Sequence, residues 1–300
     1  MSEQKDTELN LNIAFSILKK SKNIIATASL VSGILFFVYS LSLDDLYKSE
    51  ALLYSQNDNQ GASSIEAMSG LASLAGINLN NLSEDKKLLG MELISSREFF
   101  KHLITFNNIL PSLSAAKRYD KDSQTLIFNN KIYDSVKKEW LNEDNISQKP
   151  SYLEAYKRYR DVMKISSDPR TGFVKISVVH MSPEFSKDFL DLIIREVNLS
   201  IQKQDLIESE NALKYLRDEL SISRLVAVKS SLDKLIQAQL RTQMMAKISK
   251  EYVFKVLEPP YIPEEKSEPS RFALTFIGLF LGFLFSTLFI FYKTIFKKQK

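Results

Sequence analysis

Two stretches of the chain, one near each end, are mainly apolar and contain no charged residue. The first is residues 24–43 (IIATASLVSGILFFVYSLSL), which is twenty residues long, and the second is residues 272–292 (FALTFIGLFLGFLFSTLFIFY), which is twenty-one residues long. At about 1.5 Å per residue, each stretch makes a helix of roughly 30 Å, which matches the hydrocarbon core of a bilayer. The pattern therefore predicts two transmembrane helices with a domain of residues 44–271 between them.

Three segments of this domain alternate between apolar and polar residues, as strands do. Residues 46–54 (LYKSEALLY) alternate loosely, whereas residues 168–180 (DPRTGFVKISVVH) form a turn followed by a regular alternation. Residues 251–258 (EYVFKVLE) return to period two after a long helical segment. We expect this last strand to lie beside the first, which brings the chain back to where the domain begins.

Three further segments have helical periodicity. The first runs from Ser83, which is available as a cap, through leucine and phenylalanine residues to residue 103. The second covers residues 133–141, and the third covers 151–163 and opens with the capping box Ser151 to Glu154. Together with the strands, these helices predict an α+β domain.

Tyrosines follow one face of the third helix. Tyr152, Tyr156 and Tyr159 are spaced at i, i+4 and i+7, and basic residues stand between them. Such a pattern suits either a ladder that stacks on sugars or nucleic acid, or a buried face. Because all three tyrosines share one face, burial against the sheet is the better interpretation.

A run of 75 residues from Glu184 to Glu258 contains neither proline nor glycine. Its apolar stripe is helical over residues 190–201, lapses around residues 202–210, and resumes over residues 225–248. This length predicts one projecting helix of about 184–250 with a charged interruption. Because one small base domain cannot cover so long a stripe, we expect a homo-oligomer, and we assign its helix contacts to Leu225, Leu232 and Leu235.

Two segments are typical of connections. Residues 55–82 hold only two charged residues and three of the eight glycines, which predicts a long loop that is either disordered or a contact surface. Residues 259–269 contain four prolines, which favour an extended, semi-rigid connector between the domain and the second transmembrane helix. These are Pro259, Pro260, Pro263 and Pro269.

The second transmembrane helix contains a small-residue pattern. Gly278 and Gly282 are spaced as GxxxG, and Ser286 continues the series by one step. Such a face lets a neighbouring helix approach closely. We therefore expect these three residues to take part in transmembrane packing.

Charged residues next to the two apolar stretches indicate the topology. Lysines predominate in residues 1–23 and 293–300, whereas Asp44 and Asp45 follow the first stretch. The positive-inside rule then places both termini in the cytoplasm, and the domain in the periplasm of a bacterial inner membrane. A signal peptide is the alternative for the first stretch, but its length and its poor cleavage site favour an uncleaved anchor.

The composition excludes several kinds of site. Residues 44–271 have a net charge of −1 against +4 for the whole chain, which argues against a nucleic-acid partner. The absence of cysteine removes thiol chemistry, and two histidines, His102 and His180, are too few and too far apart for a triad or a zinc site. No glycine-rich phosphate loop is present. The sequence thus predicts no catalytic residue, no metal site and no cofactor.

Several motifs, taken in order, resemble the Wzz-type chain-length determinants, or polysaccharide co-polymerases. They are YKSEALL after the first transmembrane helix, SGLASLAGINLNN, SREFF, YDSVKKEW, SDPRTGFVKISVVHMSP, LKYLRDEL, and FKVLEPPYIPEEKSEP before a glycine-containing second helix. The acidic EEK within the last motif departs from the tighter proline repeat that is common in the family. The resemblance covers nearly the whole chain.

The resemblance implies a membrane-proximal α/β base domain with a long projecting helix, assembled into a ring. It also implies that the protein sets the modal length of lipopolysaccharide O-antigen, or of a related glycan, by acting with the inner-membrane polymerase on the lipid-linked chain. It does not imply an enzyme. A double-pass periplasmic sensor or adaptor without a cytoplasmic output domain is the alternative function.

Overall fold

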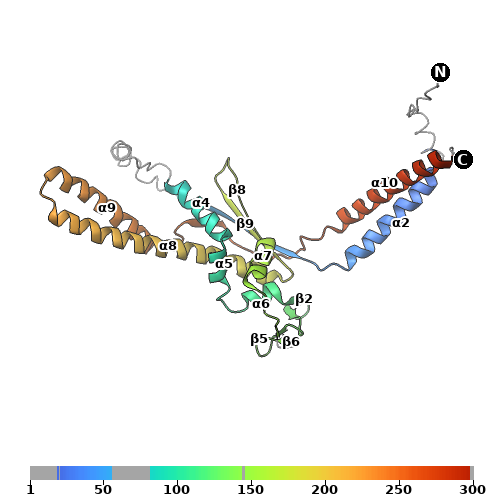
Figure 1. The fold of residues 1–300 in the computed structure, drawn as a ribbon, viewed down its shortest axis with the longest axis horizontal. Helices are drawn as coiled ribbons and strands as arrows, with labels where there is room; N and C mark the ends of the chain where they lie inside the picture. Colours follow the sequence, from blue (N-terminus) through green and yellow to red (C-terminus); the bar gives the residue numbers. More distant parts are fainter. Residues whose placement is uncertain (1–18, 20, 56–81, 144–145, 298–300) are drawn as a thin grey trace, which may run out of the picture. The chain divides into compact units, whose positions relative to one another are not determined.

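The structure is a computed structural model that describes residues 19, 21–55, 82–143 and 146–297. The predicted loop of residues 55–82 lies almost wholly outside the described residues. The chain divides into two compact units. The central unit is Tyr47–Glu265, and the terminal unit combines Met1–Leu46 with Lys266–Lys300. Figure 1 gives the labels of the elements.

The central unit is built on one antiparallel sheet in the order β10–β1–β9–β8. Its strands are β1 (Tyr47–Ser55), β8 (Met163–Ser167), β9 (Val174–His180) and β10 (Phe254–Glu258). Side chains of β1 alternate between buried and partly buried positions, as expected for a strand with one face on the core. The predicted pairing of the returning strand with the first is confirmed, since Leu53 lies opposite Val256.

The first five helices of the central unit pack with this sheet or with one another. They are α4 (Leu82–Ser95), α5 (Arg97–Leu103), α6 (Ile109–Ser114), α7 (Tyr152–Val162) and α8 (Pro183–Ile222). The capping box predicted at Ser151 and Glu154 is present in full. Ser182 caps α8 by accepting a hydrogen bond from the Phe185 N–H, and Pro183 occupies the first turn of that helix.

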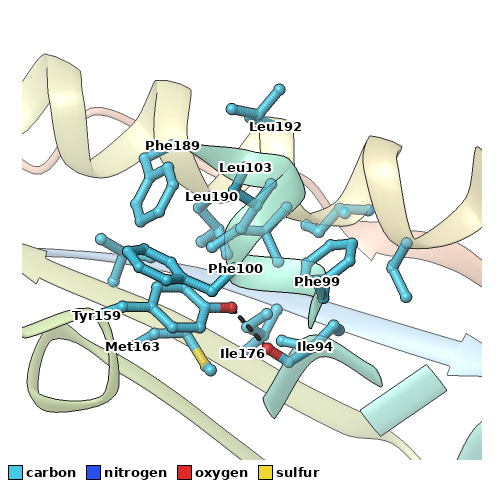
Figure 2. Close-up of a cluster of buried hydrophobic side chains, with 14 of the residues drawn as sticks. Ile94, Phe99, Phe100, Leu103, Tyr159, Met163, Ile176, Phe189, Leu190 and Leu192 are labelled. Atoms are coloured by element: carbon cyan, nitrogen blue, oxygen red, sulfur yellow. Dashed lines mark hydrogen bonds between the residues drawn. The ribbon is translucent and has the colours of Figure 1, made fainter. Parts of the chain in front are cut away.

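The core lies where α5, α7 and α8 meet, and it is rich in aromatic rings. Phe100 stacks on Tyr159 with ring centroids 5.0 Å apart, and Tyr159 meets Phe189 of α8 edge-on (Figure 2). Both Phe100 and Tyr159 are fully buried. The mixed α+β class expected from the sequence is therefore confirmed, with its core between helices and sheet.

The tyrosine face of α7 is buried as expected, and Tyr159 belongs to the same core as residues of the sheet. The hydroxyls of Tyr159 and Tyr156 donate to the carbonyls of Ile94 and Ser95, both at 2.7 Å, and Tyr152 donates to the Arg97 carbonyl. The carbonyls of Ile94 and Ser95 lie in the last turn of α4, where a helix leaves acceptors without intrahelical partners, whereas Arg97 is the first residue of α5. Tyr156 and Tyr159 thus cap the end of α4, all three tyrosines pack on Phe100, and Tyr159 shares the core with Ile176 of the sheet.

The helix predicted over residues 133–141 is wrong. This segment forms the two-stranded ribbon of β4 (Tyr133–Asp134) and β5 (Glu139–Trp140). The Asp134 carboxylate accepts hydrogen bonds from the N–H groups of Val136 and Lys137, and Lys138 has φ of 57°. A side chain that binds its own backbone in this way stabilises a turn at the expense of a helix.

Two further ribbons accompany this one between α6 and α7. They are formed by β2 (Ala116–Asp120) with β3 (Thr125–Phe128), and by β6 (Asn142–Glu143) with β7 (Ile146–Ser147). The Tyr119 hydroxyl donates to the Glu184 carboxylate at 2.7 Å, which attaches the first ribbon to the start of α8.

The single helix predicted over residues 184–250 is also wrong. The 40-residue helix α8 ends at Ile222, and α9 (Val226–Ile248) runs back along it (Figure 1). Ser223 and Leu225 are both extended at the bend. An antiparallel pair lets each helix cover part of the apolar stripe of the other, and Leu213 and Leu232 are buried in this way. The element that extends beyond the sheet is therefore a helical hairpin.

The terminal unit consists mainly of α2 (Lys22–Leu41) and α10 (Arg271–Lys297), which pack against each other. Both are long and apolar enough to cross a membrane, over Lys22–Leu41 and Arg271–Lys293. Only 17% and 11% of these windows are buried, so most of their apolar side chains face outwards, unlike those of a soluble core helix. The two helices are consistent with a two-pass membrane protein.

His180 supplies a test of this fold that depends on pH. It lies at the end of β9, where its Nε2–H donates to the Ser112 carbonyl at 3.0 Å and its Nδ1 accepts from the Ser182 N–H. Burial lowers the pKa of the His180 imidazole to about 4, although the hydrogen bond to Ser112 opposes this shift. The unfolded chain therefore takes up a proton near pH 6.5 and the folded chain does not.

We accordingly expect the wild type to lose about 3 kcal/mol relative to His180→Gln as the pH falls from 7 to 4. Above pH 6.5 the imidazole is neutral in both states and contributes no pH dependence. The measurement is the free energy of unfolding of both proteins at several pH values. A difference between them that stays constant from pH 7 to pH 4 would contradict the buried, neutral histidine.

Candidate functional site

The glycines of α10 lie where α2 approaches most closely. A Cβ atom added at Gly278 would lie 2.5 Å from the Cβ of Phe36, and one at Gly282 would lie 2.8 Å from the Cα of Ser29. Real Cβ atoms do not come so close, so both positions need glycine for this packing. The helix that the GxxxG face receives is thus α2 of the same chain.

Two serines of α2 complete this contact. The Ser29 hydroxyl donates to the Leu279 carbonyl at 2.7 Å, and the Ser32 hydroxyl donates to the Gly278 carbonyl at 2.8 Å. Gly33 lies against the side chain of Leu279. Ser29, Ser32 and Gly33 were not predicted from the sequence, although small residues at i, i+3 and i+4 within a transmembrane helix signal such a face.

Ser286 is placed differently from the two glycines. Its hydroxyl donates to the Phe283 carbonyl at 3.0 Å, one turn back in the same helix. The hydrogen-bond donor of Ser286 is therefore satisfied within α10, and the role of this residue in packing stays a prediction.

Polar contacts join the two chain arms of the terminal unit beside these helices. Leu46 exchanges backbone hydrogen bonds with Glu268, and the Asp45 carboxylate accepts from Lys266 at 2.9 Å and from Arg271 at 3.1 Å. Asp45, which the sequence analysis used only to orient the first helix, thus also links the start of the domain to the start of α10.

Two prolines of the predicted connector are buried, and its extended conformation stays a prediction. Pro259 and Pro260 follow β10 directly, and because proline has no N–H the ladder with β1 ends there. Pro260 and Pro263 are buried, three residues apart, as expected of one face of an extended, polyproline-like segment. Between them the Tyr261 carbonyl accepts a hydrogen bond from the buried Ser49 of β1. Pro269 lies in the terminal unit and is half-buried.

The three leucines assigned to oligomer contacts differ in exposure. Leu232 is buried within the hairpin of its own chain, so its burial needs no second copy. Leu225 and Leu235 are 68% and 46% exposed. Other large apolar side chains of α8, α9 and the bend between them are exposed as well: Ile207, Tyr215, Ile222, Val226, Val228, Met244 and Ile248.

The described residues contain no group of three or more His, Asp or Glu side chains suited to a metal ion. The His102 Nε2 pairs with the Glu196 carboxylate at 2.8 Å, and the other oxygen of Glu196 accepts from Arg195 at 3.1 Å. His102 also borders an open cavity of about 360 Å³ between α5 and α8. The buried carboxylate is held by two partners, so the pair is a structural link between these helices.

Comparisons with known proteins found similar solved structures. No protein-family model matches the chain, and no curated protein matches it. One similar solved structure is described as a full-length bacterial polysaccharide co-polymerase, with 11% identity, a TM-score of 0.38, and 95% of this chain and 97% of that chain covered. Another is a fragment of WzzB, a polysaccharide co-polymerase from Salmonella Typhimurium, with 14% identity, a TM-score of 0.33, and 75% of this chain and 100% of that chain covered.

The contact between α2 and α10 can be tested by filling one glycine position. Gly282→Leu should lower the free energy of unfolding in mild detergent by about 1–3 kcal/mol, because the new side chain meets the backbone of Ser29. Ala273→Leu, at an exposed position of α10, is the matched control and should have little effect. The reverse order of stability for these two variants would show that the helices do not pack through the glycine face.

Proposed function

We propose that the protein regulates the modal chain length of a surface polysaccharide, either lipopolysaccharide O-antigen or a related glycan. In this proposal it acts with the inner-membrane polymerase on the lipid-linked chain and carries no catalytic residue of its own. One observation carries the proposal. Three of the motifs that resemble Wzz-type proteins, although distant in sequence, lie on neighbouring strands of one sheet and on the segments next to them.

These segments are three strands of the sheet and the parts of the chain directly before or after them. YKSEALL lies in β1, SDPRTGFVKISVVHMSP covers the end of β8, all of β9 and the start of α8, and FKVLEPPYIPEEKSEP covers β10 and the connector. Strands β10, β1 and β9 are neighbours in the sheet.

We further propose that the chain lies in the bacterial inner membrane with both termini in the cytoplasm and the central unit in the periplasm. The lysines of residues 1–23 and 293–300 support this orientation. The packing of α2 on α10 supports a retained anchor rather than a cleaved signal peptide, because a cleaved helix would leave the glycine face of α10 without its partner.

A homo-oligomer, in a ring, is the form in which we propose that the protein acts. The exposed Leu225 and Leu235 support a contact between copies through the hairpin, since apolar side chains gathered on one element are typical of interaction surfaces. A double-pass sensor or adaptor remains the second candidate function, and it is favoured only by the topology.

The proposal is tested in a strain that lacks the gene. Without the protein, the surface polysaccharide should still be made but without a preferred length, and expression of the wild type should restore a modal band on a gel. Loss of all polymer in the deleted strain would indicate an enzyme instead. A ladder that is the same with and without the protein would favour the sensor or adaptor.

Charge substitutions then test the oligomer. Leu225→Asp combined with Leu235→Asp places two carboxylates in the proposed contact, so the particle mass in detergent should fall and the modal band should flatten. Val136→Asp, at a fully exposed turn of the central unit, is the matched control and should change neither. A single-subunit mass for the wild type itself would refute the assembly.

A further inference from the structure

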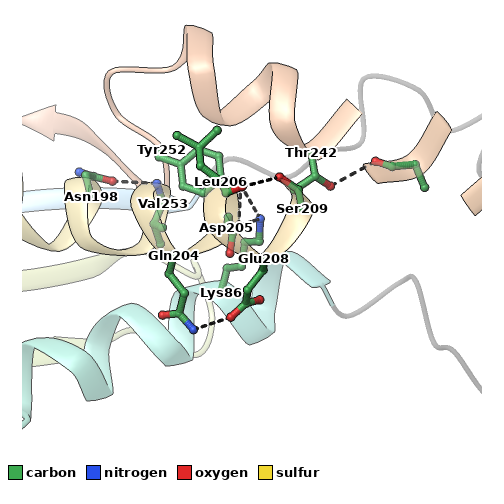
Figure 3. Close-up of polar contacts among 11 residues, drawn as sticks. Lys86, Asn198, Gln204, Asp205, Leu206, Glu208, Ser209, Thr242, Tyr252 and Val253 are labelled. Carbon is green, nitrogen blue, oxygen red and sulfur yellow. Dashed lines mark hydrogen bonds and ion pairs between the residues drawn. The ribbon is translucent and has the colours of Figure 1, made fainter. Parts of the chain in front are cut away.

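The interruption in the apolar stripe of α8 is a row of inward-facing polar side chains. Asn198, Gln202 and Asp205 are spaced at i, i+4 and i+7, so they share one face of the helix. Asn198 is buried, and the other two are half-buried, whereas the neighbouring Gln204 and Glu208 are exposed. We name Asn198, Gln202 and Asp205 the polar seam, and Figure 3 shows two of its members, Asn198 and Asp205, with their partners.

Asn198 binds the chain where it enters β10. Its Oδ1 accepts hydrogen bonds from the N–H groups of Val253 at 2.7 Å and Phe254 at 2.9 Å. Its Nδ2 donates to the Phe254 carbonyl and to the Ile194 carbonyl, both at 3.1 Å. The amide is fully satisfied by these bonds, which fix the first residue of β10 on α8.

Gln202 binds the other side of the same junction. Its Nε2 donates to the carbonyls of Ala246 and of Ser249, the latter at 2.9 Å. These carbonyls belong to the last turn and the C-cap of α9, where a helix leaves acceptors free. The Gln202 side chain of α8 therefore caps the C-terminal end of α9.

Asp205 adds a third element to the junction. Its carboxylate accepts from the Tyr252 hydroxyl at 2.6 Å and from the Lys86 Nζ of α4 at 2.8 Å, and Lys86 also donates to Tyr252 at 3.0 Å. Partial burial lowers the pKa of Lys86, but its hydrogen bonds to Asp205 and Tyr252 outweigh that effect and raise it. The lysine is thus held in its charged form.

From these contacts we infer that the polar seam sets the attachment of the α8–α9 hairpin to β10, and that this attachment determines the modal length. The second half of the inference rests on the proposed function. The reason is geometric. Helix α8 is continuous from the core into the hairpin, so the hairpin can tilt relative to β10 only by breaking bonds of the seam. Hydrogen bonds are directional, whereas apolar side chains can slide over one another.

Strand β10 gives this attachment its importance. It pairs with β1 on the sheet edge and continues along the sequence into the proline connector and α10. The seam therefore joins the element with the exposed apolar side chains to the strand that leads towards the membrane anchor.

A matched pair of substitutions tests the attachment. Gln202→Leu removes the two donors while keeping the bulk of the side chain, and Gln204→Leu makes the same change two residues further on, on the exposed face of α8. Hydrogen exchange of the full chain in detergent should become about tenfold faster over residues 246–254 in Gln202→Leu, with residues 174–180 unchanged. Gln204→Leu should leave both segments as in the wild type. Unchanged exchange over 246–254 in Gln202→Leu would overturn the attachment.

The effect on length is measured with the same variants in the deleted strain. Gln202→Leu and Tyr252→Phe, at wild-type protein level, should shift or broaden the modal band, whereas Gln204→Leu should restore the wild-type mode. Faster exchange with an unchanged mode would refute the inference on length and leave the proposed function standing. Failure of the wild type to restore any mode would refute the proposed function, and exchange alone would then decide whether the seam holds the hairpin.

Discussion

The structure depends on the antiparallel return of the C-terminal arm of the chain onto its N-terminal arm. In the central unit this return is the pairing of β10 with β1, continued beyond Glu258 by the hydrogen bond from Ser49 to the Tyr261 carbonyl. In the terminal unit it is the bridge between Leu46 and Glu268 and the packing of α10 on α2. This arrangement stabilises a chain with an apolar helix near each end, because the two helices pack closely on each other and form hydrogen bonds that lipid does not offer.

The return also explains how residues far apart in sequence are used. Because β10 pairs with β1, the chain that leaves β9 must form α8 and α9 and then return to the sheet at β10. The chain does this by extending α8 out of the core and reversing at Ser223–Leu225. The apolar half of α8 holds it over the sheet, with Leu190, Ile193 and Val197 fully buried. Its polar seam then fixes the end of α9 and the start of β10.

Much of this fold follows from local patterns that the sequence displays. Uncharged stretches of about the thickness of a bilayer identify α2 and α10, alternation identifies β1 and β9, and the capping box identifies the start of α7. The prolines likewise mark where β10 must end. In each case one short segment contains all the information, because the physical rule concerns neighbours along the chain.

The features that the sequence did not reveal depend on contacts between distant segments. No glycine or proline marks the bend after Ile222, and the reversal becomes favourable only because α9 covers α8. The sequence of residues 133–141 has a helical periodicity, but the segment forms a ribbon because the Asp134 carboxylate binds the backbone of its own turn. For the candidate sites, the GxxxG glycines were visible, but the serines of α2 and the partners of Gln202 were not, since their hydrogen bonds cross 44 to 250 positions of sequence.

The return of the two arms is tested most directly with a disulfide, since the chain has no cysteine of its own. Leu46 and Glu268 exchange backbone hydrogen bonds, so their Cα atoms should lie about 5.5 Å apart, within the range of a disulfide. Leu46→Cys with Glu268→Cys, oxidised in native membranes and then cleaved by protease within the central unit, should keep the two transmembrane fragments joined on a gel until a reductant is added. Either cysteine alone should not join them within one chain. Fragments of the double variant that separate without reductant would contradict the paired arms on which the account rests.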